Sequence, residues 1–111
     1  MIKPGVRTVG VQPQIVLAIE EARLVYKSFE QPFRITSLIE GVHSRASLHY
    51  TGCAVDIGIR GTDGYVLESD LAELIARSIK RALGGSDSDY DVILEHQRNH
   101  IHIEWQPKKP Y

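Results

Sequence analysis

Residues 100–105 read His-Ile-His-Ile-Glu-Trp and describe a strand whose two faces differ in chemistry. Side chains of a β-strand point alternately to opposite faces, so His100, His102 and Glu104 share one face, while the isoleucines and the tryptophan share the other. The apolar face can form part of a core, and the polar face can bind a ligand. This pattern predicts a sheet that is covered on one face and open on the other.

A second strand pattern, residues 53–59, carries one carboxylate among apolar residues. The apolar residues at odd positions can point into the core, which puts Asp56 on the opposite face. On that face its neighbours are Ala54 and Gly58, whose small size leaves space beside the carboxylate. A carboxylate in an apolar strand needs a compensating cation or several hydrogen-bond donors. Either a metal ion or the backbone amides of a loop could compensate the charge of the Asp56 carboxylate.

Apolar residues at three- and four-residue spacing predict two amphipathic helices. The first covers residues 14–30 and lies between two prolines, and the second covers residues 70–83. Ser69 or Asp70 can cap the start of the second helix, and Gly84-Gly85 can end it.

Two further runs complete the predicted elements. Residues 33–39 alternate well enough for a strand that is followed by a polar loop, and residues 90–95 form a strand that turns at residues 96–99 into the strand 100–105. Residues 106–111 are expected to be a loosely held tail. The order αββαββ predicts a single α+β domain over residues 1–111, a small and mainly antiparallel sheet with two helices packed on one face.

Composition limits the number of domains and the kinds of partner. The chain has 111 residues, 42% hydrophobic and 24% charged, which suits one core and leaves no room for a second domain. A net charge of -1 with scattered Lys and Arg argues against a nucleic-acid partner. No apolar run has the roughly 20 residues of a membrane span, and no signal-peptide pattern opens the chain, so we expect a cytoplasmic product. The single Cys53 excludes an internal disulfide and a Cys-rich zinc knuckle.

His49, Asp56, His100 and His102 form a set of candidate metal ligands of nitrogen and oxygen type. A lone histidine on a strand is more often hydrogen-bonded than metal-bound, but two at alternate positions, with a third before an aspartate, favour a metal. Two imidazoles and one carboxylate leave one position of a tetrahedral Zn²⁺ open, as in hydrolytic sites. Such ligands can also hold non-haem iron, although the chain is too short for the barrel that those oxygenases use. A thiol protease is disfavoured because Cys53 alternates onto the core face.

The spacing of these residues resembles a known superfamily. The run 47–56 reads Ser-Leu-His-Tyr-Thr-Gly-Cys-Ala-Val-Asp; Ile35-Thr36-Ser37 and His43 precede it, and His100-Ile101-His102 follows. This pattern, Ser-x-His-x-x-Gly-x-Ala-x-Asp and then His-x-His, is similar to the zinc D-Ala-D-Ala carboxypeptidase and endopeptidase superfamily, which also contains the hedgehog signalling domain. The resemblance covers residues 35–104 and implies a hedgehog-like or D-Ala-D-Ala peptidase-like fold.

The resemblance implies that His49, Asp56 and His102 bind one catalytic Zn²⁺, with His100 beside the metal as a catalytic residue. A general base must lie within reach of the water at the open position. Our choice is Glu95, seven residues before His102, although the carboxypeptidases have an acid three residues before this histidine, where this chain has Asn99. Two alternatives stay open: His96, at the hedgehog-like spacing, and Glu104, which could instead orient a ligand.

Three residues of the segment before Asp56 are further candidates by the same resemblance. His43, six residues before the first ligand histidine, could stabilise the developing oxyanion or be an ordinary loop histidine. Ser47 corresponds to a serine that can contact the terminal carboxylate of the substrate, or it caps a turn. The arginine that usually follows the Ile-Thr-Ser strand is missing, and Arg45 is the nearest cation to replace it.

The function that these residues predict is hydrolysis of peptidoglycan peptides by a zinc-activated water. The expected partner is a stem peptide or a D-amino-acid dipeptide, without nucleic acid or membrane, and the expected state is a monomer. A wall-lytic enzyme of a phage or bacterium, released through a permeabilised membrane, and an enzyme of cytoplasmic dipeptides both fit. The alternative is a hedgehog-like zinc module that binds proteins without turnover.

Overall fold

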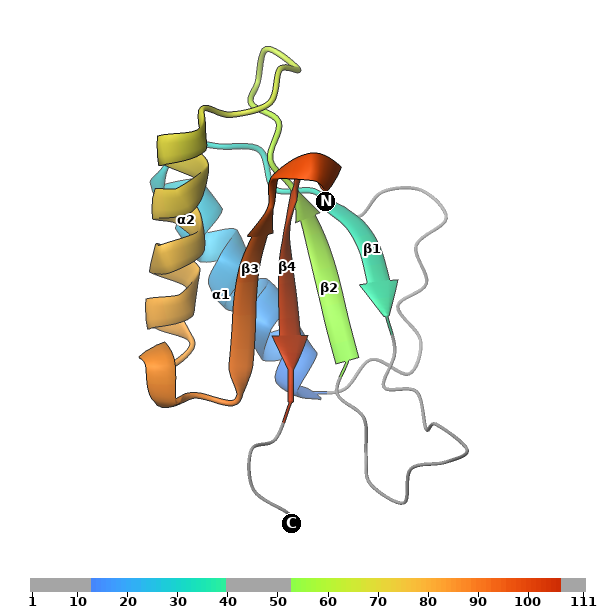
Figure 1. Cartoon of the computed structure of the whole chain (residues 1–111), viewed down its shortest axis with the longest axis vertical. Helices are drawn as coiled ribbons and strands as arrows, with labels where there is room; N and C mark the ends of the chain where they lie inside the picture. The colour runs from blue at the N-terminus through green and yellow to red at the C-terminus, as the bar shows by residue number, and fades with distance from the viewer. Residues whose placement is uncertain (1–12, 40–52, 107–111) are drawn as a thin grey trace.

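The computed structural model describes residues 13–39 and 53–106, which form two helices and a four-stranded sheet (Figure 1). The elements follow in the order α1, β1, β2, α2, β3, β4, as the sequence predicts, with a short 3₁₀ helix before β3 and another after it. The α+β class is therefore confirmed. In the described part of the chain, neither helix has the length and apolar character needed to cross a membrane.

Both helices bury one apolar stripe each. α1 (Pro13–Ser28) begins at a proline, whose fixed φ suits the first helical position. α2 (Ser69–Ala82) ends where Gly84 adopts a φ of 108°, which only glycine tolerates easily. The fully buried residues of the two stripes are Ile15, Ala18, Ala22 and Tyr26 in α1 and Ala72, Ile75, Ala76 and Ile79 in α2.

The predicted side-chain cap of α2 is wrong. The N-cap residue is Glu68, whose side chain makes no capping hydrogen bond, and Ser69 and Asp70 lie inside the helix. Asp70 in the first turn and Lys80 and Arg81 in the last turn still interact favourably with the helix dipole. Burial of the apolar stripe therefore fixes this helix more than its cap does.

The sheet has the strand order β1-β2-β4-β3, and every neighbouring pair is antiparallel. β3 (Tyr90–Glu95) and β4 (His100–Trp105) have the predicted bounds, whereas β1 (Ile35–Ile39) begins two residues later than predicted and β2 (Cys53–Gly58) ends one residue earlier. β4 is the last strand in the chain but lies inside the sheet.

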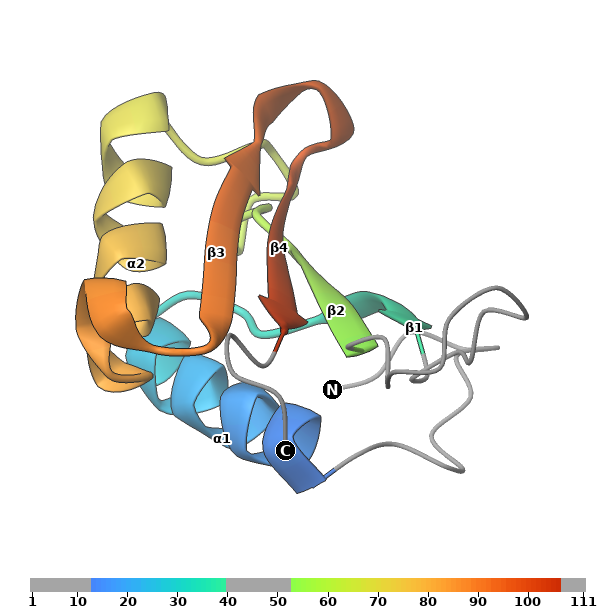
Figure 2. The same ribbon diagram turned by 60° about the horizontal axis from the view of Figure 1, so that its bottom comes forward.

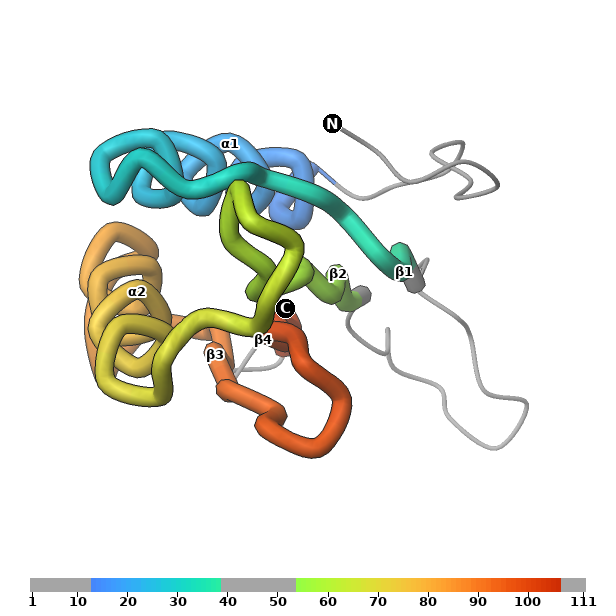
Figure 3. Tube along the Cα trace, turned by 90° about the horizontal axis from the view of Figure 1, so that it is seen from above, coloured from blue at the N-terminus to red at the C-terminus, as the bar shows by residue number. Residues whose placement is uncertain are grey.

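Both helices pack on one face of this sheet (Figures 2 and 3). α1 lies against β2 and β4, and α2 lies against β3. The residues of the two inner strands that face the helices, Val55, Ile57, Ile101 and Ile103, are completely buried. This confirms the predicted alternation, since the residues between them face the other side.

The turn between β3 and β4 is a single 3₁₀ turn, His96–Arg98, followed by Asn99. Asn99 has a φ of 56°, a left-handed conformation that asparagine tolerates better than most residues. The tight turn sets the register of the hairpin, which pairs Glu95 with His100.

Candidate metal centre

The face of the sheet opposite the helices brings together polar residues that lie far apart in the sequence. In the register of β2 and β4, Asp56 pairs with His102 and Gly58 pairs with His100. Because directly paired residues of antiparallel strands point to the same face, these side chains meet. The same rule places Glu95 of β3 beside His100.

Four of these side chains form one hydrogen-bonded cluster. Nδ1 of His102 donates to Oδ1 of Asp56 over 2.7 Å, and Nε2 of His100 donates to Oε1 of Glu95 over 2.8 Å. The two pairs are connected, since Nε2 of His100 lies 3.6 Å from Oδ1 of Asp56 and Nδ1 of His102 lies 4.0 Å from Oε1 of Glu95.

The donor atoms of this cluster are close enough to hold a metal ion. Asp56, Glu95 and His100 each offer one ligand atom, and these atoms all lie within 4.8 Å of one another. Carboxylate oxygen and imidazole nitrogen are ligands that zinc and other first-row metals accept. Asp56 and His100 are only 8% and 9% exposed, so their polar atoms are largely withdrawn from water. The cluster is therefore a candidate site for a metal ion.

His102 lies between two carboxylates. Its Nδ1 faces Asp56, while its Nε2 lies 3.2 Å from Oε1 of Glu104. Burial by itself would lower the pKa of His102, but the hydrogen bonds and charges of Asp56 and Glu104 outweigh burial and raise this pKa. A carboxylate on the second ring nitrogen is also the arrangement that orients metal-bound histidines in proteins.

Glu95 has more contact with water than Asp56. The hydrogen bond from His100 lowers the pKa of Glu95, and the charges of the two histidines and Arg98 act in the same direction. The carboxylate is therefore ionised at neutral pH. It can accept a proton from a group bound in front of the cluster.

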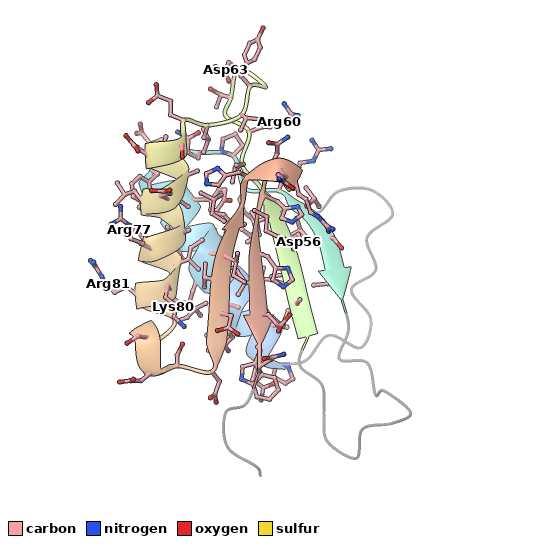
Figure 4. The ribbon with its side chains drawn as sticks, in the orientation of Figure 1. Asp56, Arg60, Asp63, Arg77, Lys80 and Arg81 are labelled. Atoms are coloured by element: carbon pink, nitrogen blue, oxygen red, sulfur yellow. The ribbon has the colours of Figure 1, made fainter. Side chains whose placement is uncertain are left out.

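The cluster opens into a pocket of about 580 Å³. Asp56, Gly58 and His100 form part of its wall, and three arginines, Arg34, Arg60 and Arg98, form another part. Figure 4 shows Asp56 within β2 and Arg60 beyond the end of that strand. The pocket therefore connects the candidate metal ligands with a cationic rim.

The structure brings together five of the residues proposed from the sequence: Asp56, Glu95, His100, His102 and Glu104. The proposed ligand His49, the candidates His43, Arg45 and Ser47, and the side chain of Cys53 lie outside the described residues. His96, the alternative base, is exposed, and within residues 53–106 its imidazole makes no hydrogen bond with the cluster.

The three arginines of the pocket were missed in the sequence. They belong to three separate segments, so no local motif contains them. Arg34 precedes β1, Arg60 follows β2, and Arg98 lies in the turn from β3 to β4. In an antiparallel sheet of this order, the start of β1, the end of β2 and the β3–β4 turn lie at the same end of the sheet. Only the strand order, which the sequence does not show, indicates that these arginines lie close together.

No protein-family model, no curated protein and no solved structure matches this chain.

Proposed function

We propose that this protein is a zinc-dependent peptidase that hydrolyses peptidoglycan stem peptides, at D-Ala-D-Ala or D-Ala–diamino acid bonds. The proposal includes the hedgehog-like or D-Ala-D-Ala peptidase-like version of the α+β fold. The observation that carries it is the meeting of Asp56, Glu95, His100 and His102 in one cluster. Two of the four, Asp56 and His100, line a pocket. Asp56, His100 and His102 belong to the motif of the resemblance, and Glu95 is the base chosen beside it. The four residues come from three strands.

In this proposal Asp56 and His102 hold the zinc ion together with His49. When bound, zinc supplies a Lewis acid that polarises a carbonyl oxygen and makes water more acidic. Glu104 accepts a hydrogen bond from Nε2 of His102 and thereby leaves Nδ1 directed at Asp56. The ligand and its orienting carboxylate lie on the same strand, which keeps their separation fixed.

Glu95 is the proposed general base. Its carboxylate is ionised and lies at the mouth of the cluster, so it can take a proton from the attacking water and pass it to the leaving amine. His100 donates to Oε1 of Glu95 and so holds the carboxylate toward Asp56. The alternative metal set consists of Asp56, Glu95 and His100. With that set Glu95 would be a ligand and could not act as base.

Two measurements on purified variants distinguish these assignments. We expect the unmodified protein to bind one zinc ion by elemental analysis, and His102→Ala to lose it, because the ligand set would be reduced to two. His100→Ala should keep zinc if His100 is only a neighbour. The opposite result, with zinc lost in His100→Ala and kept in His102→Ala, selects the alternative set.

Catalysis is tested with the Glu95→Gln variant on a defined muropeptide, with mass spectrometry of the products. We expect Glu95→Gln to bind zinc and to lose activity by about 10²-fold or more, since positioned acid–base groups contribute on this scale. Arg81→Gln, on the outer side of α2, is the control and should keep full activity (Figure 4). A zinc-loaded unmodified protein that cleaves no stem-peptide bond contradicts the peptidase proposal and favours a binding module without turnover.

A further inference from the structure

Part of the wall of the pocket that contains Asp56 and His100 is cationic. Arg34, Arg60 and Arg98 all line it, and Asp56 is the one acidic residue among the described residues of its wall. The chain as a whole has a net charge of -1, so this local excess of positive charge is not a property of the whole surface. The rim of the pocket therefore attracts anions.

Two of these guanidinium groups have no hydrogen-bonding partner among the described residues. Within residues 13–39 and 53–106, the side chains of Arg34 and Arg98 form no hydrogen bond and no ion pair. Arg60 donates from Nη1 to the carbonyl of Gly64 over 2.9 Å, which leaves its other donors available. The three arginines therefore have more N–H donors than the described residues provide acceptors for.

The segment that carries Arg60 is held in place by its own backbone. Arg60 pairs with Val66 in an isolated bridge, and the amide of Leu67 donates to the carbonyl of Ile59 over 2.8 Å. Gly64, at a φ of 84°, allows the tight turn between the two sides. This short hairpin positions Arg60 beside the mouth of the pocket, which reduces the entropy lost on binding.

We propose that this pocket binds a carboxylate of the substrate next to the cluster, with Arg34, Arg60 and Arg98 as the residues that determine specificity. The planar guanidinium group pairs with a carboxylate through two parallel hydrogen bonds. The proposal deepens the peptidase assignment and rests on it for the identity of the substrate.

The carboxylate can come from two places in a peptide: its C-terminal end or an acidic side chain. Three small probes separate these sources. N-acetyl-D-alanine carries a terminal carboxylate, N-acetyl-D-glutamic acid α-amide carries a side-chain carboxylate, and N-acetyl-D-alanine amide carries none. Binding is followed by the NMR signals of the arginine Nε–H groups in the zinc-supplemented protein, so the readout does not require turnover.

We expect at least one carboxylate probe to shift the Nε–H signals of the pocket arginines and to bind at least about tenfold more tightly than the amide probe. Preference for N-acetyl-D-alanine assigns the pocket to a chain end, and preference for the glutamic acid derivative assigns it to a side chain. Equal binding of all three probes, or no binding at millimolar concentration, overturns the proposal.

The variants Arg34→Gln and Arg98→Gln should each weaken binding of the preferred probe by about tenfold, because each removes charge-assisted hydrogen bonds. Arg77→Gln on α2 is the matched control and should have no effect (Figure 4). Loss of binding in Arg77→Gln to the same extent would show a nonspecific charge effect and overturn the assignment.

Failure of the peptidase proposal gives a different result. If the protein binds the carboxylate probes through Arg34 and Arg98 but cleaves no muropeptide, the anion site is supported and the peptidase proposal is contradicted. If the protein binds no carboxylate probe and cleaves stem peptides and their amidated forms with the same kcat/KM, the peptidase proposal is supported and the anion site is contradicted.

Discussion

At the scale of single residues, the site depends on side chains that fix one another. His102 is held by Asp56 on one ring nitrogen and by Glu104 on the other. Each carboxylate limits the rotation of the ring, and together they raise the pKa of the histidine against the effect of burial. Asp91 pairs with Glu104 across β3 and β4 but makes no hydrogen bond to His102 among the described residues.

This arrangement predicts that Glu104 supports metal binding without being a ligand. In Glu104→Ala we expect zinc affinity to fall by about 10- to 100-fold, the usual effect of removing a group that orients a metal-bound histidine. Competition with a chromophoric chelator measures the affinity. Asp91→Ala removes a neighbouring carboxylate of the same strand pair and should change the affinity little. Similar losses in both variants would show that only the total charge matters.

At the scale of elements, the strand register decides which side chains meet on the face of the sheet opposite the helices. α2 ends at Gly84, and the chain passes through Gly85 and a short 3₁₀ turn into β3. Because β3 carries Glu95 at its far end, the register set by this connection and by the β3–β4 turn decides whether Glu95 reaches His100.

Gly84→Ala should therefore destabilise the domain by about 1 to 2 kcal/mol, since alanine is unfavourable at the left-handed φ of 108°. A Cβ at this position would also lie 3.0 Å from Cβ of Ser88. Gly85 has a φ of 78°, and nothing lies within 4 Å of a Cβ added there. Gly85→Ala should consequently cost less in urea unfolding. An equal or larger loss in Gly85→Ala would contradict the role of the Ser88 contact.

At the scale of the whole molecule, one hydrogen bond joins the helical layer directly to the edge of the site. The hydroxyl of Tyr26, a completely buried residue of α1, donates to the carbonyl of Gly58 over 3.1 Å. Gly58 pairs with His100 in the sheet and lines the pocket. Burial of the phenol raises the pKa of Tyr26, so the hydroxyl remains a donor throughout the neutral range.

Tyr26→Phe should lower the free energy of unfolding by about 1 kcal/mol, because the partly buried carbonyl of Gly58 loses its tyrosine donor while the ring packing is kept. Chemical denaturation measures the change. Tyr65, which is 76% exposed, provides the control, and Tyr65→Phe should stay within about 0.5 kcal/mol of the unmodified protein. An unchanged stability in Tyr26→Phe would mean that water replaces the tyrosine as donor.

Much of the fold was predictable because its signals are local. The alternation in residues 100–105 and the helical spacing of the two apolar stripes gave the element order and the buried faces. The predicted cap of α2 was wrong: Ser69 and Asp70 have side chains suited to capping, but the N-cap falls at Glu68, one residue before Ser69. Local preference of this size is readily outweighed by burial.

For the site, the sequence by itself determined which residues could bind a metal, since the imidazoles and carboxylates must lie on the faces that alternation assigns to them. Only the tertiary structure decided which of them meet. The strand order β1-β2-β4-β3 inserts the last strand between β2 and β3, which puts Asp56 and Glu95 on either side of the histidines. It also gathers the arginines of the pocket at one end of the sheet. Pairing between distant strands is set by burial of the whole sheet, and no local segment contains that information.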